Sequence, residues 1–243
     1  MLIDRLLEVT VESLDTALAA ERGGADRIEV CAELTHGGVT PPAAALRKIH
    51  DELEIPVFAI IRPRAGNFVY SDAEFQVMLR SIDTVRDLSL EGVALGILRD
   101  DCTIDIERTR ELVDAARPLE VTFHRAFDST PDFLRALDDV LRTGATRILT
   151  SGGAKGAPEG AAALRQLVHA AGDRIMVVPG AGLHSGNIAQ VAAETRANEF
   201  HSGLGTVLPY GSTNLAKFES EIHSMKRVLH SLNYTSATKQ QPT

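Results

Sequence analysis

Residues 119–151 read LEVTFHRAFDSTPDFLRALDDVLRTGATRILTS and contain a complete strand, helix and second strand. The apolar runs at 119–124 and 146–151 are short, which predicts buried strands. Between them, residues 131–142 show the apolar spacing of an amphipathic helix, with Pro131 expected at its first position and Gly144 just after its end. A strand, a helix and a strand in this order are typical of a parallel sheet.

The same unit repeats along the chain. Further strands are expected at 6–11, 26–31, 56–61, 92–98, 174–179 and 197–201. Further helices are expected at 13–22, 41–53, 72–88, 105–116, 158–171, 185–194 and, after the last strand, 213–232. Eight strands, each followed by a helix, in 243 residues predict an α/β fold that closes as a single (β/α)₈ TIM barrel with an extra C-terminal helix.

An open doubly wound sheet is the alternative, but no G-x-G-x-x-G opens a helix after the first strand. No linker or change of pattern indicates a second domain. We therefore expect one domain over residues 1–234 and a polar, disordered tail over residues 235–243.

Composition excludes several classes of partner. The net charge is −8 and the lysines and arginines form no basic stripe, so nucleic acid is not an expected ligand. The first residues, MLIDRLLEVTV, are too short and too polar for a signal peptide, and no apolar run approaches the ~20 residues of a membrane span. Two distant cysteines, Cys31 and Cys102, favour a reducing cytoplasmic setting.

The alternation of side chains along each strand directs an unusual set of polar residues into the barrel. In the first strand Leu7, Val9 and Val11 should face the helices, which leaves Glu8 inside. The same argument in the other strands gives an inward set of Glu8, Glu29, Arg62, Thr122, His124, Ser151, Glu199 and His201. An unpaired buried charge costs several kcal/mol, so these groups should pair or line a wet pocket. Most of them lie toward the strand ends where barrel enzymes have their active sites.

Four of these residues are candidates for acid/base catalysis. They are Glu8, Glu29, His124 and His201. A histidine titrates near neutral pH and can act as a general acid or base. The structural alternative for His124 is a ring held by a carboxylate or a backbone carbonyl. No lysine lies in an expected strand, and Lys155 in a loop is a weak candidate, so Schiff-base chemistry is disfavoured.

A second set of residues is suited to an anionic substrate. Guanidinium groups bind carboxylate or phosphate, and glycine-rich loops after the sixth and seventh strands can direct backbone N–H groups at an anion. The candidates are Arg62, Arg64, Arg125, Asp128, Ser151, Gly152, Gly180 and Gly182. Three alternatives stay open: Arg62 or Arg64 pairs with Glu8 or Glu29, Arg125 pairs with Asp128, and the glycines only form tight turns.

Several stretches together resemble the CutC family, which is named for copper homeostasis. They are GADRIEVCAELTHGGVTP (24–41), IIRPRAGNFVYSD (60–72), VTFHRAFD (121–128), RILTSGG (147–153), GAG (180–182) and NEFHSG (198–203). The resemblance extends from about residue 6 to residue 230. It implies a (β/α)₈ barrel, a cytoplasmic location, a homo-oligomer that is often a dimer, and copper handling with Cu(I) bound through cysteines.

The resemblance can be followed at the cysteines. Cys31 matches the family cysteine of the E-x-C-A segment, so it is the expected Cu(I) ligand. Val69 stands where other members carry a cysteine in F-C-Y-S-D, and Cys102 matches neither motif. From the residues alone, Cys31 can equally be a small buried apolar side chain.

Two functions therefore stay open. By resemblance the chain is a copper homeostasis protein that binds copper. By residue chemistry it is an enzyme with an acid/base site at the barrel mouth, acting on a small phosphorylated or carboxylated substrate. The four catalytic candidates could also hold a divalent metal, although no H-x-H or H-E-x-x-H spacing supports one.

Overall fold

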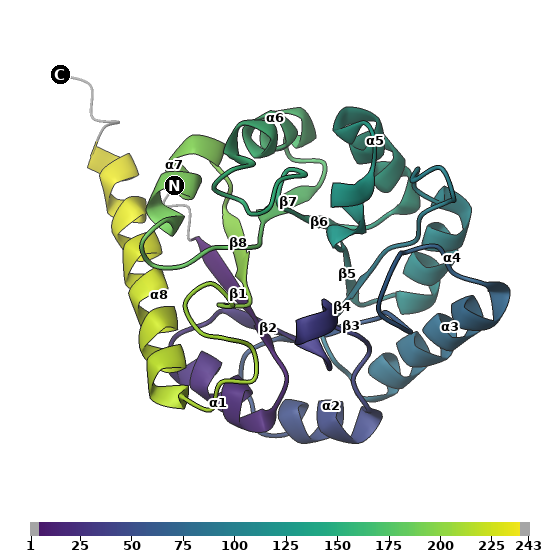
Figure 1. Cartoon of the computed structure of the whole chain (residues 1–243), viewed down its shortest axis with the longest axis horizontal. Coiled ribbons are helices and arrows are strands. Elements are labelled where there is room, and N and C mark those ends of the chain that lie inside the picture. Colours follow the sequence, from purple (N-terminus) through teal and green to yellow (C-terminus); the bar gives the residue numbers. More distant parts are fainter. Residues whose placement is uncertain (1–4, 239–243) are drawn as a thin grey trace.

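The computed structural model describes residues 5–238, with side chains described as far as residue 232. Its strands are β1 (Leu6–Val11), β2 (Arg27–Val30), β3 (Val57–Ile60), β4 (Gly92–Leu95), β5 (Glu120–Phe123), β6 (Arg147–Thr150), β7 (Met176–Pro179) and β8 (Glu199–Ser202). All paired strands are parallel, in the order β7-β6-β5-β4-β3-β2-β1-β8. A parallel bridge between Gly180 and His201 joins the two ends of this sheet into the ring seen in Figure 1. The strand order never reverses, so the predicted TIM barrel is confirmed.

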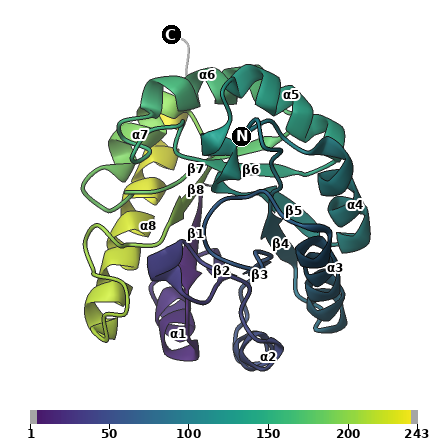
Figure 2. The same ribbon diagram turned by 45° about the vertical axis from the view of Figure 1, so that its right-hand side comes forward.

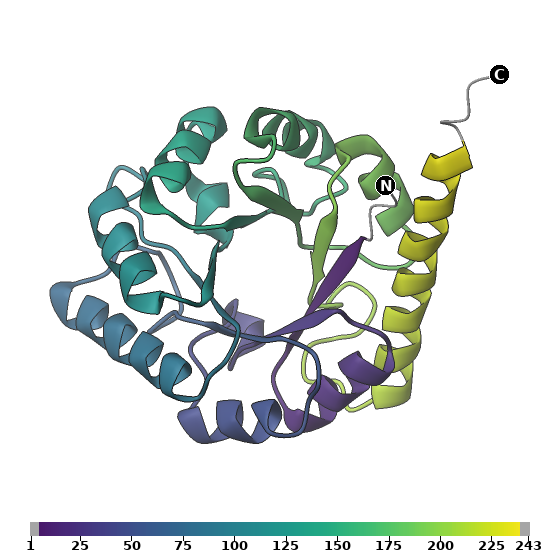
Figure 3. The same ribbon diagram turned by 180° about the vertical axis from the view of Figure 1, so that it is seen from behind.

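Helices form a second ring outside the strands (Figures 1 and 3). They are α1 (Leu14–Arg22), α2 (Ala43–His50), α3 (Asp72–Asp87), α4 (Ile106–Ala116), α5 (Phe133–Thr143), α6 (Ala161–Ala171), α7 (Ile188–Thr195) and α8 (Leu215–Thr238). The extra helix α8 packs against both α1 and α7 and covers the outside of the barrel near β1 (Figure 2). Of the expected tail, the backbone of residues 235–238 continues α8, and residues 239–243 lie outside the described residues.

Local signals set several helix ends. Gly144 ends α5, as expected, and Ser13 and Ser71 cap α1 and α3, each within a capping box. The expectation for Pro131 is wrong, because α5 begins at Phe133. The carboxylate of Asp132 accepts hydrogen bonds from the backbone N–H groups of two residues in the first turn, so Asp132 is the N-cap and Pro131 precedes it.

The hydrophobic core lies between the sheet and the helices. Leu7, Val9 and Ile28 are fully buried there, as their outward alternation predicts. Burial of each such side chain contributes about 1.5–3 kcal/mol. Ile61 belongs to the same core, and this direction turns the next residue, Arg62, toward the mouth of the barrel. The apolar core is formed by the strand side chains that face the helices. The positions that face the barrel interior can therefore be polar.

Two short 3-10 helices, which were not expected, follow β2 and β5. The first is η1 (Leu34–His36) and the second is η2 (Arg125–Ser129). The strand in VTFHRAFD thus ends at Phe123, and His124 is the N-cap of η2 rather than the last residue of the strand. No helix within residues 5–238 is long and apolar enough to cross a membrane.

Candidate active site

The lower half of the barrel contains a closed network of charges, called here the lower ion network: Glu8, Arg27, Arg147 and Glu199. Arg27 donates from Nε to Glu8 Oε2 at 2.5 Å and from Nη2 to Glu199 Oε2 at 2.6 Å. Arg147 donates from Nη1 to the same Glu8 oxygen at 3.1 Å, and its Nη2 lies 2.7 Å from Glu199 Oε2. The two carboxylates are thus matched by two guanidinium groups, which also lie 4.7 and 5.2 Å from the ring centroid of Phe58.

Arg27 and Arg147 were not among the expected inward residues. Arg27 lies two residues before Glu29, and Arg147 lies four residues before Ser151, so the alternation that directs those later residues inward applies to both arginines. The signal was present, but both arginines stand at the starts of their strands, away from the mouth. Without them the environment of Glu8 could not be predicted.

His201 connects the lower ion network to the mouth. Its Nδ1 lies 2.6 Å from Glu8 Oε1, and its Nε2 lies 2.7 Å from the hydroxyl oxygen of Thr10. Burial alone would raise the pKa of Glu8, but Arg147, His201 and Arg27 hold it well below its usual range. Burial lowers the pKa of His201, while the hydrogen bond with Glu8 and the charge of Glu29 outweigh this effect and raise it overall. An ionised Glu8 requires the proton of the imidazole on Nδ1.

Glu29 differs from Glu8 in having no partner. It is 5% exposed, and within the described part of the chain its carboxyl group makes no hydrogen bond. Burial is the main cause that raises its pKa to about 7, with smaller and opposing contributions from His201 and Glu8. Glu29 is therefore a buried carboxyl group that exchanges its proton near neutral pH.

His124 presents a neutral hydrogen-bond donor. The backbone N–H of Ala126 donates to its Nδ1 at 3.3 Å, so the proton of the neutral ring is on Nε2. That Nε2 is buried and has no hydrogen-bond partner among the described residues. Burial, assisted by the charge of Arg62, lowers the pKa of His124 to about 3. The ring is therefore uncharged at neutral pH and has a free N–H to offer.

These groups meet in a cavity of about 150 Å³ at the carboxyl ends of the strands, called here the mouth pocket. Of the predicted site residues, those that line it are Glu29, Cys31, Arg62, His124, Arg125 and His201. Those that do not line it are Glu8, Arg64, Asp128, Ser151, Gly152, Gly180 and Gly182. Thr10 and Tyr210 also line the pocket and were not expected there.

The two arginines around Pro63 have different positions. Arg62 is buried, and its Nη atoms donate to the backbone carbonyls of His36, Gly38 and Gly66 while its charge borders the mouth pocket. Arg64 donates from Nε to Glu74 at 2.5 Å and from its Nη atoms to the backbone carbonyls of residues 65, 67 and 69. These hydrogen bonds of Arg64 stabilise the loop before α3.

The glycine-rich loop after β6 binds an anion of the protein itself, the carboxylate of Asp128. The carboxylate of Asp128 accepts from the backbone N–H groups of Ser151 and Gly153 at 3.0 and 3.1 Å, and from the hydroxyl of Thr150 at 2.5 Å. Gly153 can present its N–H because it adopts a φ of 73°. Arg125 donates to Asp128 at 2.8 Å, the ion pair that was one of the two alternatives for these residues. The loop and η2 are thus joined by an internal carboxylate.

Gly180 has a structural reason to be glycine. It forms the bridge to His201 that closes the barrel, and a Cβ at this position would lie 2.5 Å from a methyl carbon of Leu149. Gly152 donates its N–H to Thr150, and Gly182 accepts a hydrogen bond from the side chain of Asn187. Each of these contacts is made to another part of the chain.

The donors in the mouth pocket do not fit a two-thiolate copper site. Cys31 is 1% exposed, and burial with the charges of Glu29 and Glu12 raises the pKa of its thiol, so the thiolate is disfavoured. Cys102 is exposed, and Val69 is not among the residues of the pocket.

A hard-cation site is also poorly supported. Glu8, Glu29 and His201 offer ligand atoms within 4.8 Å of one another. However, both oxygens of Glu8 and both ring nitrogens of His201 already have protein partners. The arrangement is therefore described better as a hydrogen-bonded charge network than as an open set of ligands.

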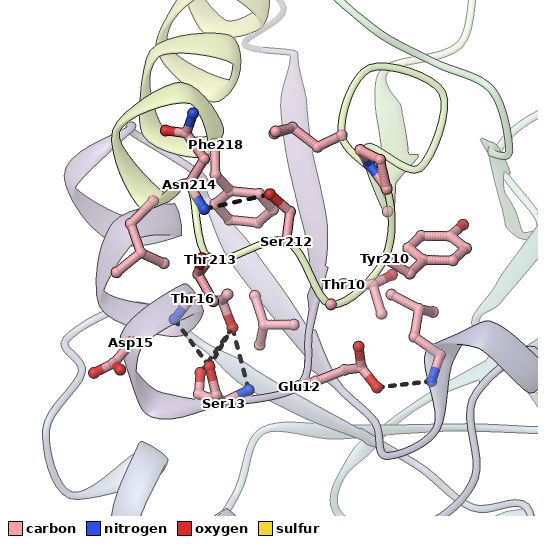
Figure 4. Close-up of a pocket in the computed structure, with 17 residues that line it drawn as sticks. Thr10, Glu12, Ser13, Asp15, Thr16, Tyr210, Ser212, Thr213, Asn214 and Phe218 are labelled. Atoms are coloured by element: carbon pink, nitrogen blue, oxygen red, sulfur yellow. Dashed lines mark hydrogen bonds between the residues drawn. The ribbon is translucent and has the colours of Figure 1, made fainter.

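A second cavity has a volume of about 370 Å³ and is called here the outer pocket (Figure 4). The segment after β1 and the loop before α8 form its walls, and Glu12 accepts a hydrogen bond from the backbone N–H of Leu34 at 2.8 Å. The two pockets share Thr10, Leu34, Gly203 and Tyr210. Thr10 therefore stands where the two cavities meet.

Fold and site together define a TIM-barrel protein with a polar pocket at the carboxyl ends of its strands. The chain belongs to the CutC family, whose model matches residues 5–206. It is 47% identical over 200 residues to a CutC family protein of Chromobacterium violaceum, covering 82% of this chain and 81% of that one. It is 40% identical over 238 residues to the human copper homeostasis protein cutC homolog, covering 96% of this chain and 86% of that one.

Solved structures give the same family and fold. The crystal structure of a CutC protein from Streptococcus agalactiae matches with a TM-score of 0.78 and 32% identity, over 82% of this chain and 98% of that one. Phosphoribosylanthranilate isomerase from Thermotoga maritima matches with a TM-score of 0.60 and 16% identity, over 92% and 99% of the two chains, a likeness of fold alone. The expected cytoplasmic location and dimer stay predictions.

Proposed function

We propose that this protein is an enzyme that moves a proton on a small anionic substrate with a carbonyl group bound in the mouth pocket. The observation that carries the proposal is Glu29, a buried carboxyl group with no hydrogen-bond partner among the described residues and a pKa of about 7. A general acid or base works best when its pKa lies near the operating pH. Strong perturbation of a pKa by burial inside a pocket is typical of functional sites.

His124 supplies the complementary group. Its free Nε2–H can donate to the carbonyl oxygen of a substrate while Glu29 removes a proton from the adjacent carbon. Negative charge that develops on the oxygen is then stabilised by a fixed donor in a site of low dielectric constant. His124 donates this hydrogen bond as a neutral ring, because burial and the charge of Arg62 lower its pKa to about 3.

Arg62 and Arg125 support the choice of an anionic substrate. Both line the mouth pocket, and the lower ion network has no excess positive charge to offer. Most donor atoms of Arg62 are used by backbone carbonyls, so its contribution is mainly its charge. Arg125 is more exposed and also donates to Ser151 at 3.0 Å, so it can attract a carboxylate or phosphate at the rim.

Hydrogen exchange in heavy water tests the proposal. Small 2-oxo and 2-hydroxy carboxylates and sugar phosphates are incubated with the protein in D₂O, and the proton signal beside the carbonyl group is followed by NMR. We expect the wild-type protein to exchange that proton for at least one member of the set. Glu29→Gln should slow the exchange by roughly 10²–10⁴-fold, the usual size of a general-base contribution.

The matched control is Glu12→Gln, because Glu12 lines the outer pocket and not the mouth pocket. It should exchange the proton at the wild-type rate. Exchange that survives Glu29→Gln unchanged would remove Glu29 from the mechanism. Ligands that bind in the pocket, as judged by a shift of the melting temperature, but never exchange a proton would count against proton transfer itself.

Copper handling is the second candidate, because the names of the human and mouse relatives carry it. Its support in this chain is Cys31, which lines the mouth pocket. Cu(I) selects soft thiolate or thioether ligands, and the thiol of Cys31 is held in its protonated form with no second thiol lining the pocket. We therefore prefer the enzyme, and metal analysis of the purified protein tests a bound copper or divalent ion directly.

A further inference from the structure

Thr10, His201 and Glu8 form a continuous hydrogen-bonded chain that ends at the mouth pocket. Glu8 and Thr10 are two residues apart on β1, so both face inward, and the register of β1 with β8 places His201 opposite Glu8. The imidazole therefore spans the two side chains, with 2.6 Å from Nδ1 to Glu8 Oε1 and 2.7 Å from Nε2 to Thr10 Oγ1. Thr10 is 4% exposed and lines both pockets. Figure 4 shows it among the residues of the outer pocket.

We propose that Thr10 is a nucleophile, with His201 as its base and Glu8 as the group that orients the base, and that this triad accepts an acyl ligand such as an ester, thioester or amide. A hydroxyl within hydrogen-bond reach of a base, which is itself held by a third group, is the arrangement that activates serine and threonine nucleophiles. The triad shares the mouth pocket with the proposed proton transfer but needs neither Glu29 nor a substrate C–H bond.

The reaction consists of two balanced halves. Thr10 Oγ1 forms a bond to the carbonyl carbon and gives its proton to His201 Nε2. The tetrahedral intermediate then collapses, the bond to the leaving group breaks, and His201 returns the proton to that group. A water molecule next attacks the acyl-threonine ester, again through His201, so that a carboxylic acid is released and the hydroxyl of Thr10 is restored.

The electrostatics of the lower barrel suit this role. Arg27 and Arg147 keep Glu8 ionised, so Nδ1 of His201 carries the proton and Nε2 is the atom that faces Thr10. Because the pKa of His201 is raised, its neutral, proton-accepting form needs a higher pH than that of an ordinary histidine. In the same pocket the Nε2–H of His124 lacks a partner and can serve an oxyanion.

A fluorophosphonate probe tests the nucleophile without knowledge of the natural ligand. Attack by Thr10 forms an O–P bond and expels fluoride, while the proton of the hydroxyl goes to His201. We expect one stoichiometric adduct by intact-protein mass spectrometry, located on Thr10 by peptide mapping. The rate of labelling should increase several-fold between pH 6 and pH 8, which a purely structural hydrogen bond would not produce.

Variants test whether labelling depends on the triad or only on the general reactivity of a hydroxyl group. Thr10→Val, which keeps the shape of the side chain, should abolish the adduct, and Thr10→Ser should retain it. His201→Gln should slow labelling at least about 100-fold. Thr16→Val is the matched control, because Thr16 lines the outer pocket and, among the described residues, its hydroxyl bonds only with Ser13, so labelling should be unchanged. An adduct that persists in Thr10→Val, or no adduct on folded wild-type protein and Thr10→Ser at pH 8, overturns the proposal.

Discussion

The lower ion network and the mouth pocket are built from the same kind of inward-facing position, yet their charged groups behave in opposite ways. Glu8 and Glu29 are both almost fully buried and lie on neighbouring strands. The pKa of Glu8 is held far below its usual range, whereas that of Glu29 is raised to about 7. The difference is one of partners, because two arginines and a histidine contact Glu8 and none contacts Glu29 through a hydrogen bond.

This contrast separates a buried carboxylate that has partners from a buried carboxyl group that has none. A buried charge that is paired with an opposite charge takes the place of an apolar side chain in the packing of the barrel. A buried titratable group without partners destabilises the folded state. When such a group lies beside a pocket, it is typical of a binding or catalytic site. The same comparison makes the stability of single variants predictable.

The largest effect is expected when the lower ion network is broken. Arg147→Met removes one of the two cations that face Glu8 and Glu199 and leaves their charges incompletely matched in the barrel interior. The expected loss of unfolding free energy is about 3–5 kcal/mol, measured by urea denaturation at pH 7.

Arg135→Met is the control for this loss. The side chain of Arg135 is 72% exposed and its ion pair with Asp139 spans 3.9 Å, so the loss should be below about 1 kcal/mol. If Arg147→Met also costs less than that, the network is not an essential part of the barrel interior.

Removing the unpaired carboxyl should have the opposite sign. The pKa of Glu29 is about 7 in the folded protein and 4.5 in the unfolded chain, so the folded state binds the proton more tightly. Its contribution is favourable below pH 4.5 and is lost as the pH rises through 7. Glu29→Gln should therefore be more stable than the wild type by about 3 kcal/mol at pH 8, and the difference should disappear toward pH 5.

Paired urea denaturation curves at pH 5 and pH 8 measure this pH-dependent difference. Glu12→Gln again serves as the control, since Glu12 lies outside the mouth pocket. A variant that is no more stable than the wild type at pH 8 would mean that Glu29 has a partner in solution and is not poised for proton transfer.

The sequence was sufficient for the fold because the local signals agree with one another. Short apolar runs alternate with amphipathic segments, and capping residues such as Ser13 and Ser71 mark the helix starts correctly. The alternation along strands also directed Glu29 and His124 into the barrel, where the structure has them lining one pocket. Periodicity is a property of neighbouring residues, so it can be read without the tertiary structure.

Pairing between distant residues could not be predicted in this way. Glu8 meets Arg147 only because of how β6 lies across the barrel from β1, and Asp128 meets the loop at Ser151 only because η2 turns the chain after β5. The pKa of each carboxyl group depends on these contacts. Sequence therefore identified the carboxyl groups and histidines of the barrel interior but not which of them would be left without a partner.

A smaller effect is expected for His124, whose Nε2, like the carboxyl group of Glu29, has no hydrogen-bond partner among the described residues. Its pKa is about 3 in the folded protein against 6.5 in the unfolded chain, so protons favour the unfolded state between these values. The stability that depends on the neutral ring is present above pH 6.5 and falls by roughly 1.4 kcal/mol per pH unit below it. Between pH 6.5 and pH 5, the unfolding free energy of His124→Phe should fall by about 2 kcal/mol less than that of the wild type.

Denaturation across this pH range with His169→Phe as the control isolates the effect, because His169 is exposed. The control should keep the acid sensitivity of the wild type. If His124→Phe keeps it as well, the ring of His124 is protonated without cost, and it would not be the neutral donor proposed for the pocket.

The smallest effect is expected for Cys31, which lines the mouth pocket but is neither a paired charge like Glu8 nor an unpaired one like Glu29. Cys31→Ser replaces a thiol that is protonated and has no second thiol in the pocket, so Cu(I) affinity measured with a competing chelator should equal that of the wild type within about twofold. Cys102→Ser is the matched control, because Cys102 is the exposed cysteine and a nonspecific thiol effect would appear there first. Tight stoichiometric Cu(I) binding that disappears in Cys31→Ser alone would restore the copper assignment, since a proton would then have been displaced from a buried thiol by the metal.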